Sequence, residues 1–205
     1  MSITGLLISL ALLLLCVSVH EFAHGWVAYK LGDNTAKYSG RLTLNPLAHI
    51  DPMGTIILPL FLFIVTQGRF VFGAAKPVPV NFSLLRNPKR DIIWVGLSGP
   101  AANFIFAILL SLAWRIFPSI PLINFIFWSL ITTNVILGVF NLVPVPPLDG
   151  SRVLIGLLPQ RLAIKYAAIE PYGFTIVMLL VFLGLFNVIV EPLTNMILRW
   201  LIMPF

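Results

Sequence analysis

The chain has little charge, one cysteine and few histidines. Charged residues make up 10% of its 205 residues, whereas soluble domains carry about 25%. This shortage excludes an ordinary soluble globular domain. The single cysteine, Cys16, excludes an internal disulfide, and three histidines are too few for a multi-histidine di-iron centre. The net charge of +6 is carried by residues between apolar runs, so it indicates membrane orientation and no nucleic-acid partner.

Apolar residues dominate instead. They make up 59% of the chain, and the mean hydropathy is +1.01. Long apolar runs occupy about 5–31, 53–66, 92–114, 122–143 and 173–190. A helix that crosses the bilayer needs about 20 residues, and all these runs except 53–66 come near or exceed that length. The sequence therefore predicts an all-α polytopic membrane protein embedded in the lipid bilayer.

The shortest run predicts a hairpin. It follows residues 40–46, whose sequence is typical of a short strand and turn. We expect residues 40–66 to form a hairpin or re-entrant loop that returns to the side from which it entered. Such backbone must be covered by protein or water. The tail after Glu191 and Pro192 predicts a short apolar helix.

The distribution of basic residues predicts the orientation. With the C-terminal end of the first run in the cytoplasm, 11 of the 13 Lys and Arg residues are cytoplasmic, and Arg115 and Arg199 are outside. The cytoplasmic residues are Lys30, Lys37, Arg41, Arg69, Lys76, Arg86, Lys89, Arg90, Arg152, Arg161 and Lys165. This agrees with the excess of positive charge on cytoplasmic loops. We therefore expect a multi-pass protein of the plasma or inner membrane.

The first apolar run contains an H-E-x-x-H pattern formed by His20, Glu21 and His24. On a helix, His20 and His24 lie one turn apart on the same face and can bind one Zn²⁺ through their imidazoles. Glu21 beside them can take a proton from water at the metal. Ionisable side chains inside a membrane span are costly, so we interpret these three as functional.

A third ligand is expected because catalytic zinc usually has three protein ligands and one open position. Asp149 follows the fourth run in a proline-rich stretch, residues 144–149, that cannot continue a helix. Gly150 permits a tight turn directly after the carboxylate. In the orientation above, the first and fourth runs end on the same side of the membrane, so this stretch can fold back towards His20 and His24.

These motifs resemble the site-2 protease family of intramembrane zinc metalloproteases. The resemblance rests on H-E-x-x-H in the first run and on N-x-x-P-x-P-P-L-D-G at residues 141–150. Residues 98–104, S-G-P-A-A-N-F, are similar to the middle core helix of that family. Residues 41–46 and 49–55 are similar to the loop of its small bacterial and archaeal members. No PDZ-like or CBS-like domain is present in the 205 residues, so the resemblance is to the minimal members.

The resemblance implies the roles of five residues. His20, His24 and Asp149 are implied as ligands of one Zn²⁺ per chain, and Glu21 as the catalytic base. Asn141 matches a family asparagine near the scissile peptide, where its amide can stabilise the oxyanion. The implied activity is a zinc endopeptidase that cleaves within or near transmembrane segments of membrane proteins, as in regulated intramembrane proteolysis. Its active site is expected to open to the cytoplasm.

The expected architecture is one membrane domain, residues 1–205. It has a three-helix catalytic core with a re-entrant or hairpin loop in about 5–160 and an additional C-terminal helical part in about 161–205. The oligomeric state does not follow from these motifs.

A transmembrane substrate must unwind before it can be cut, because its carbonyls are hidden in its own helix. An extended substrate can then pair with an exposed strand edge. Leu42, Thr43, Leu44 and Asn45 are the candidates for that edge, although plain scaffolding is an equal alternative. Asn103 is a further candidate for substrate contact, with helix packing as its alternative.

Two other functions remain open at this point. In a protease of another class, Glu170 or Glu191 would be the third ligand, and Asp149 would only form a turn with Gly150. In a zinc carrier or sensor, the same ligands would bind metal and Glu21 would be dispensable.

Three polar residues have structural explanations as well. His49 is interpreted as a hydrogen-bonding residue of the re-entrant loop. Cys16 is interpreted as an inert buried thiol. Asn141 has the alternative of packing beside the proline-rich turn.

Overall fold

The computed structural model describes residues 3–67, 73 and 75–202. Helices form all of its regular structure, and no strand occurs within those residues. The elements in chain order are α1 (Ile3–Lys30), α2 (Thr35–Tyr38), η1 (Pro46–His49), η2 (Pro52–Ile57), α3 (Leu58–Val65), η3 (Phe82–Leu84), α4 (Pro88–Trp114), α5 (Pro121–Asn141), α6 (Asp149–Leu157), α7 (Gln160–Ala167), η4 (Glu170–Tyr172), α8 (Gly173–Phe182), η5 (Phe186–Val190) and α9 (Glu191–Ile202).

Four helical segments in the described part are long and apolar enough to cross a membrane: 3–30, 88–114, 121–141 and 160–182. The first of them, α1, has 28 residues and is about 42 Å long at 1.5 Å per residue. It therefore exceeds the hydrocarbon core, which is about 30 Å thick. The expected all-α polytopic membrane protein is confirmed.

The centre of the fold is a group of three long helices. α4 packs against both α1 and α5, and α6 lies along α4. Apolar side chains fill the space between α4, α5 and α9, with Ile131, Val135 and Val190 fully buried. Polar residues are buried here as well, including Asn103 and Asn134 at 0% exposure. A polar group in such a place needs a hydrogen-bond partner, because leaving it unpaired is costly.

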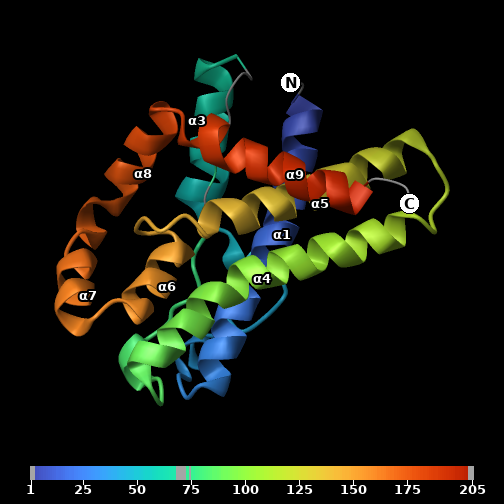
Figure 1. Ribbon diagram of the computed structural model, residues 1–205. Helices are drawn as coiled ribbons and strands as arrows, with labels where there is room; N and C mark the ends of the chain where they lie inside the picture. Colours follow the sequence, from blue (N-terminus) through green and yellow to red (C-terminus); the bar gives the residue numbers. More distant parts are fainter. Residues whose placement is uncertain (1–2, 68–72, 74, 203–205) are drawn as a thin grey trace.

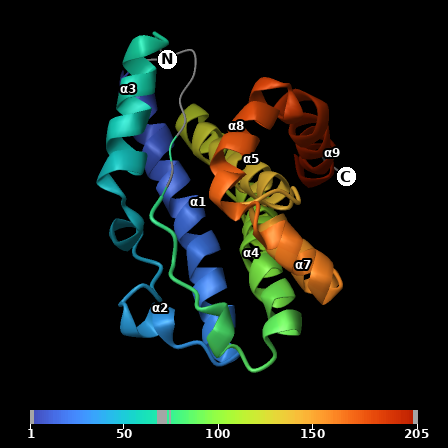
Figure 2. The same ribbon diagram turned by 90° about the vertical axis from the view of Figure 1, so that its left-hand side faces the viewer.

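The chain between α1 and α4 forms a hairpin, but a longer one than expected: the predicted range 40–66 holds only the outgoing limb, and the return follows it. η2 and α3 run back along the N-terminal half of α1, and residues 75–85 run towards the C-terminal end of α1 (Figure 2). Thr55, Gly73 and Ala75 all face the same part of α1, around Leu14. The backbone amide of Arg86 donates to the carbonyl of Leu31 at 3.0 Å, so the hairpin returns to the C-terminal end of α1. Arg69, which the orientation argument counted as cytoplasmic, lies outside the described residues.

The strand expected within residues 40–46 is wrong. Residues 41–45 have no strand partner in the described chain. The side chain of Asn45 instead accepts from the amide of Leu47 and caps η1. Asn and Asp side chains compete for backbone donors in this way, which favours caps and turns over strand pairing.

The C-terminal part differs from the expected run at 173–190. The apolar segment begins earlier, at Gln160, and ends at Phe182. Gly184 has φ +96°, a left-handed conformation that glycine adopts without strain, and the chain turns there. The short helix expected after Pro192 is confirmed as α9, which packs on α5 and α4.

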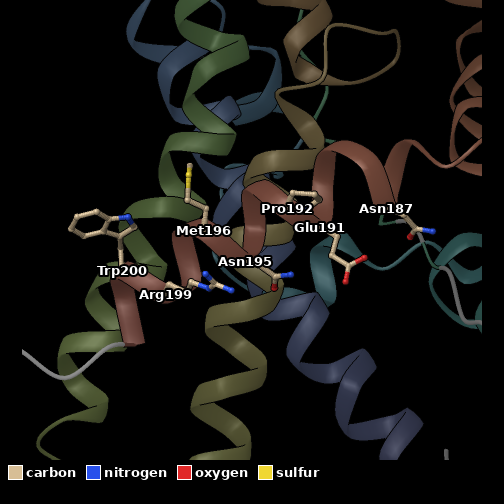
Figure 3. A pocket seen from close by; sticks show the side chains of 7 residues that line it. All are labelled: Asn187, Glu191, Pro192, Asn195, Met196, Arg199 and Trp200. Atoms are coloured by element: carbon tan, nitrogen blue, oxygen red, sulfur yellow. The ribbon is translucent and has the colours of Figure 1, made fainter.

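A pocket of about 700 Å³ lies along α9 (Figure 3). Asn187, Glu191, Asn195 and Arg199 follow each other at four-residue spacing on one face of η5 and α9, as residues separated by one helical turn do. None of its lining residues belongs to the metal cluster described next.

Candidate metal centre

His20 and His24 lie side by side on α1, as their spacing predicts. Their ring centroids are 4.6 Å apart, and their Nε2 atoms are 3.0 Å apart. His20 is 5% exposed and His24 is 8% exposed. Two imidazoles that share a helix face and point their Nε2 atoms at one place are arranged to bind one cation.

Asp149 reaches this pair from the start of α6. Its Oδ2 is 3.0 Å from Nε2 of His20 and 3.1 Å from Nε2 of His24. The turn that brings it there depends on Gly150, because a Cβ at that position would lie 2.6 Å from the carbonyl carbon of Leu142 and the carbonyl oxygen of Val143. A side chain cannot fit so close to backbone, so only glycine lets the proline-rich stretch fold back on itself.

The three donor atoms form a triangle that suits zinc. Its sides are 3.0, 3.0 and 3.1 Å, whereas tetrahedral ligands at zinc distances lie about 3.3 Å apart. Burial alone would raise the pKa of the Asp149 carboxyl, but His24 and His20 beside it outweigh burial and hold that pKa below its usual range. A triangle of two imidazoles and one carboxylate leaves one tetrahedral position for water or substrate.

The second nitrogen of each imidazole has a partner behind the cluster. Nδ1 of His24 donates to the carbonyl of Val95 on α4 at 2.7 Å. The same carbonyl accepts from the hydroxyl of Ser98 at 2.7 Å. Nδ1 of His20 lies 2.5 Å from Oδ1 of Asn103. Such outer contacts fix the ring orientation and leave Nε2 for the metal.

Gly99 allows α4 to approach the histidines. A Cβ there would lie 2.6 Å from both Cε1 and Nε2 of His20, closer than real contacts. The absence of a side chain is therefore a condition for the cluster to form against α4.

Glu21 faces the returning limb of the hairpin. Its Oε2 accepts from the backbone amide of Val78 at 2.7 Å. Val78 is 7% exposed, and Lys76 two residues earlier donates its amide to the carbonyl of His49 at 2.9 Å. The limb is thus attached both to the loop and to the carboxylate next to the metal ligands.

Two of the candidate residues do not join the ligand triangle itself: Asn141 makes no contact with it among the described residues, and Asn103 contacts only the back of His20. The amide of Asn141 donates to the carbonyl of Leu137 in its own helix at 3.0 Å, and no contact with His20, His24 or Asp149 is seen for it among the described residues. Asn103 is fully buried behind His20. This placement favours an orienting role for Asn103 over contact with a substrate.

The loop with Leu42, Thr43, Leu44 and Asn45 lies beside α1. Leu42 lies against Gly25, the residue after His24: its Cδ1 would be 3.3 Å from a Cβ built there. The carbonyl of Thr43 faces inward and accepts from Nε2 of buried His49 at 2.9 Å. Leu44 is 55% exposed, and Asn45 is exposed as well. The loop is therefore next to the site without forming the sheet edge that the sequence suggested.

The alternative third ligands do not reach the cluster. Glu170 is paired with Arg152 through two hydrogen bonds, one of them 2.9 Å long. Glu191 lines the pocket on α9. Of the described residues, His20, His24 and Asp149 form the group of metal-binding type.

The sequence argument missed Val78, Val95 and Asn134, which contact Glu21, His24 and Asn103. Val78 and Val95 act through backbone atoms, which leave no signal in the residue type. Asn134 does carry one, because a lone amide inside an apolar helix needs a partner.

The sequence matches the model of peptidase family M50 over residues 8–120 and 117–185. It is 38% identical to "Putative zinc metalloprotease YwhC" of Bacillus subtilis over 192 residues, which cover 89% of this chain and 84% of that protein. It is 35% identical to "Putative zinc metalloprotease Rip2" of Mycolicibacterium smegmatis over 174 residues, which cover 82% of this chain and 63% of Rip2. It is 27% identical to "Zinc metalloprotease MJ0392" of Methanocaldococcus jannaschii over 154 residues, 73% of this chain and 34% of that protein. No solved structure matches the chain significantly.

Proposed function

The chain belongs to peptidase family M50, the site-2 protease family of zinc metalloproteases, and from this premise we propose that it is an intramembrane endopeptidase. Its substrates are membrane proteins, cut within or near a transmembrane segment, as in regulated intramembrane proteolysis. The observation that carries this proposal is the triangle formed by His20 and His24 of a long apolar helix and Asp149 of α6, with Glu21 next to His20 in the sequence.

Zn²⁺ is the cofactor, and we propose His20, His24 and Asp149 as its ligands. When bound, zinc lowers the pKa of a coordinated water and polarises the substrate carbonyl. Glu21 takes the proton from the attacking water and returns it to the leaving amine. The amide of Val78 holds one oxygen of Glu21, and we assign the proton to the other oxygen, which has no hydrogen bond to the residues that the structure describes.

Asn141 is the proposed donor to the oxyanion. Its side chain now bonds within α5, so it must turn towards the substrate when one binds. The loop at 42–45 is the proposed substrate contact, through exposed Leu44 and Asn45 rather than through a preformed strand.

The proposed location is the plasma or inner membrane, with the site opening to the cytoplasm. The support for this is the distribution of basic residues: of those the structure describes, all but Arg115 and Arg199 lie between the end of α1 and the start of α4, or in α6 and α7. The whole chain then acts as one membrane domain.

The test compares the purified protein with Glu21→Gln in detergent. We expect both proteins to bind one zinc per chain, and we expect cleavage of a model transmembrane substrate to fall by about 10²–10⁴-fold in the variant, because general-base catalysis contributes that much. Glu191→Gln is the matched control, since that carboxylate is exposed on α9. Equal cleavage by wild type and Glu21→Gln would refute the role of Glu21 and favour a zinc carrier or sensor.

A further inference from the structure

Behind His20, the interior of the protein contains a small polar group drawn from three helices. Cys16 on α1, Asn103 on α4 and Asn134 on α5 are each 0% exposed. Two amides buried between apolar helices are costly unless every donor and acceptor is paired. Their hydrogen bonds form one continuous chain that ends at His20.

The direction of each bond in this chain is fixed by backbone carbonyls, which can only accept. Nδ2 of Asn134 donates to the carbonyl of Leu130 at 2.8 Å and to Sγ of Cys16 at 3.1 Å. Its Oδ1 must therefore face Asn103, whose Nδ2 donates to it at 2.7 Å. The same Nδ2 also donates to the carbonyl of Cys16 at 3.3 Å.

With Nδ2 of Asn103 committed in this way, its Oδ1 faces Nδ1 of His20 at 2.5 Å. An amide oxygen accepts, so Nδ1 of His20 must carry the proton and Nε2 the free electron pair. Nε2 is the atom that lies 3.0 Å from Oδ2 of Asp149. Nδ1 of His24 carries the proton as well, because it donates to the carbonyl of Val95.

We propose that Asn134 and Asn103 form a positioning relay that holds His20 in the tautomer and orientation that bind zinc. The proposal rests on the zinc site proposed above. Asn134 contacts none of the three proposed metal ligands. It acts by preventing the amide of Asn103 from turning over. A reversed amide would present NH₂ to Nδ1 of His20, place the imidazole proton on Nε2 and so oppose metal binding.

A positioning role for Asn103 and Asn134 predicts a change in zinc affinity, which a packing role alone does not. Loss of the outer partners of a metal-binding histidine typically lowers metal affinity by about 10–100-fold. We expect Asn103→Leu and Asn134→Leu each to lower zinc affinity within that range. Asn103→Asp should bind zinc more tightly than Asn103→Leu, because the buried neutral acid still accepts from Nδ1 of His20 with one oxygen and donates its O–H to Oδ1 of Asn134.

The experiment titrates the purified proteins with zinc against a chromophoric chelator, with no substrate present. Ser111→Ala is the matched control: Ser111 is also a buried polar residue of α4 (5% exposed), but its hydroxyl donates to the carbonyl of Leu201. Its zinc affinity should not change. Visible absorption of the Co²⁺-substituted proteins gives a second measurement, in which the two leucine variants should show an altered ligand field and Asn103→Asp should not.

Each outcome decides a different claim. Wild-type zinc affinity and cobalt spectrum in folded Asn134→Leu would overturn the relay while leaving the protease proposal standing. If Asn134→Leu does not fold, equal affinities of Asn103→Leu and Asn103→Asp would overturn it. A wild type that binds zinc but cleaves nothing would count against the proposed protease alone, and a wild type that binds no zinc would refute both.

Discussion

The two sides of the metal cluster are built differently. On the deep side, the partners of the histidines are the fully buried Asn103 and the carbonyl of Val95, both from α4. On the open side, the side chain of Asp149 is 17% exposed, and Glu21 is held by the backbone of Val78. The deep side is buried and orients the imidazoles, whereas the open side is where the proposed function needs water and substrate to enter. The proposed intramembrane protease would need both properties, because its ligands must stay in place in apolar surroundings while its substrate exchanges.

The largest effect is expected from removing the proposed ligand on the open side. Loss of a hydrogen-bond partner behind a metal ligand lowers metal affinity by up to about 100-fold. Asp149→Ala removes a proposed ligand itself, so it should lower zinc affinity by more than that and abolish cleavage. His49→Ala is the control, because His49 donates to the carbonyl of Thr43 away from the cluster, and it should keep one zinc per folded chain. Metal analysis of both proteins makes the measurement; full zinc occupancy in Asp149→Ala would remove Asp149 from the ligand set.

A change on the deep side should have the next largest effect. In Gly99→Ala the added methyl would lie 2.6 Å from two ring atoms of His20, so the imidazoles must move, and overpacking of this kind costs about 1–3 kcal/mol. We expect loss of zinc binding together with a lower melting temperature.

Gly138→Ala separates these two consequences of Gly99→Ala. A Cβ at Gly138 would lie 2.8 Å from the ring of Phe104 and touch no ligand. It should therefore lower stability while zinc stays bound. If both variants bind zinc equally well, the close approach of α4 at Gly99 is not what positions the histidines.

A smaller effect is expected from the contact that holds Glu21. Val78→Pro removes the amide that donates to Oε2. A hydrogen bond to a charged group contributes about 1.5–3 kcal/mol, so we expect kcat to fall by about 10–100-fold with zinc content unchanged.

Val78→Ala keeps that amide and serves as the control for lost packing at a side chain that is 7% exposed. The two variants should differ in kcat at equal zinc content. A kcat for Val78→Pro equal to that of Val78→Ala would show that Glu21 does not depend on the amide.

The smallest effect is expected far from both sides of the cluster. Glu170→Gln weakens the ion pair with Arg152, in which the side chain of Glu170 is 42% exposed. Exposed ion pairs contribute about 0–1 kcal/mol, so the unfolding free energy should change by no more than that, and zinc binding should stay the same. Loss of zinc in this variant would revive a glutamate as the third ligand.

Local sequence patterns predicted much of the fold. Helical spacing placed His20 and His24 on one face of α1. Apolar runs at about 5–31, 92–114 and 122–143 predicted three spans, which the structure has at 3–30, 88–114 and 121–141. The pattern failed at residues 40–46, where side-chain capping replaced a strand. It also failed at the C-terminal segment, which begins at Gln160 because α7 and η4 continue into α8 with polar residues among the apolar ones.

The sequence by itself determined the chemistry available to this protein: two imidazoles one turn apart with a carboxylate next to the first, all in an apolar helix. It also limited the candidates for the third metal ligand to a few other carboxylates. Only the tertiary structure decided how that chemistry is held, because the decisive contacts join residues far apart in the chain. Asp149 meets His24 across 125 positions, Asn103 meets His20 across 83, and Val78 meets Glu21 across 57. Periodicity and propensity act over a few residues, whereas contacts at such separations exist only once the helices have packed.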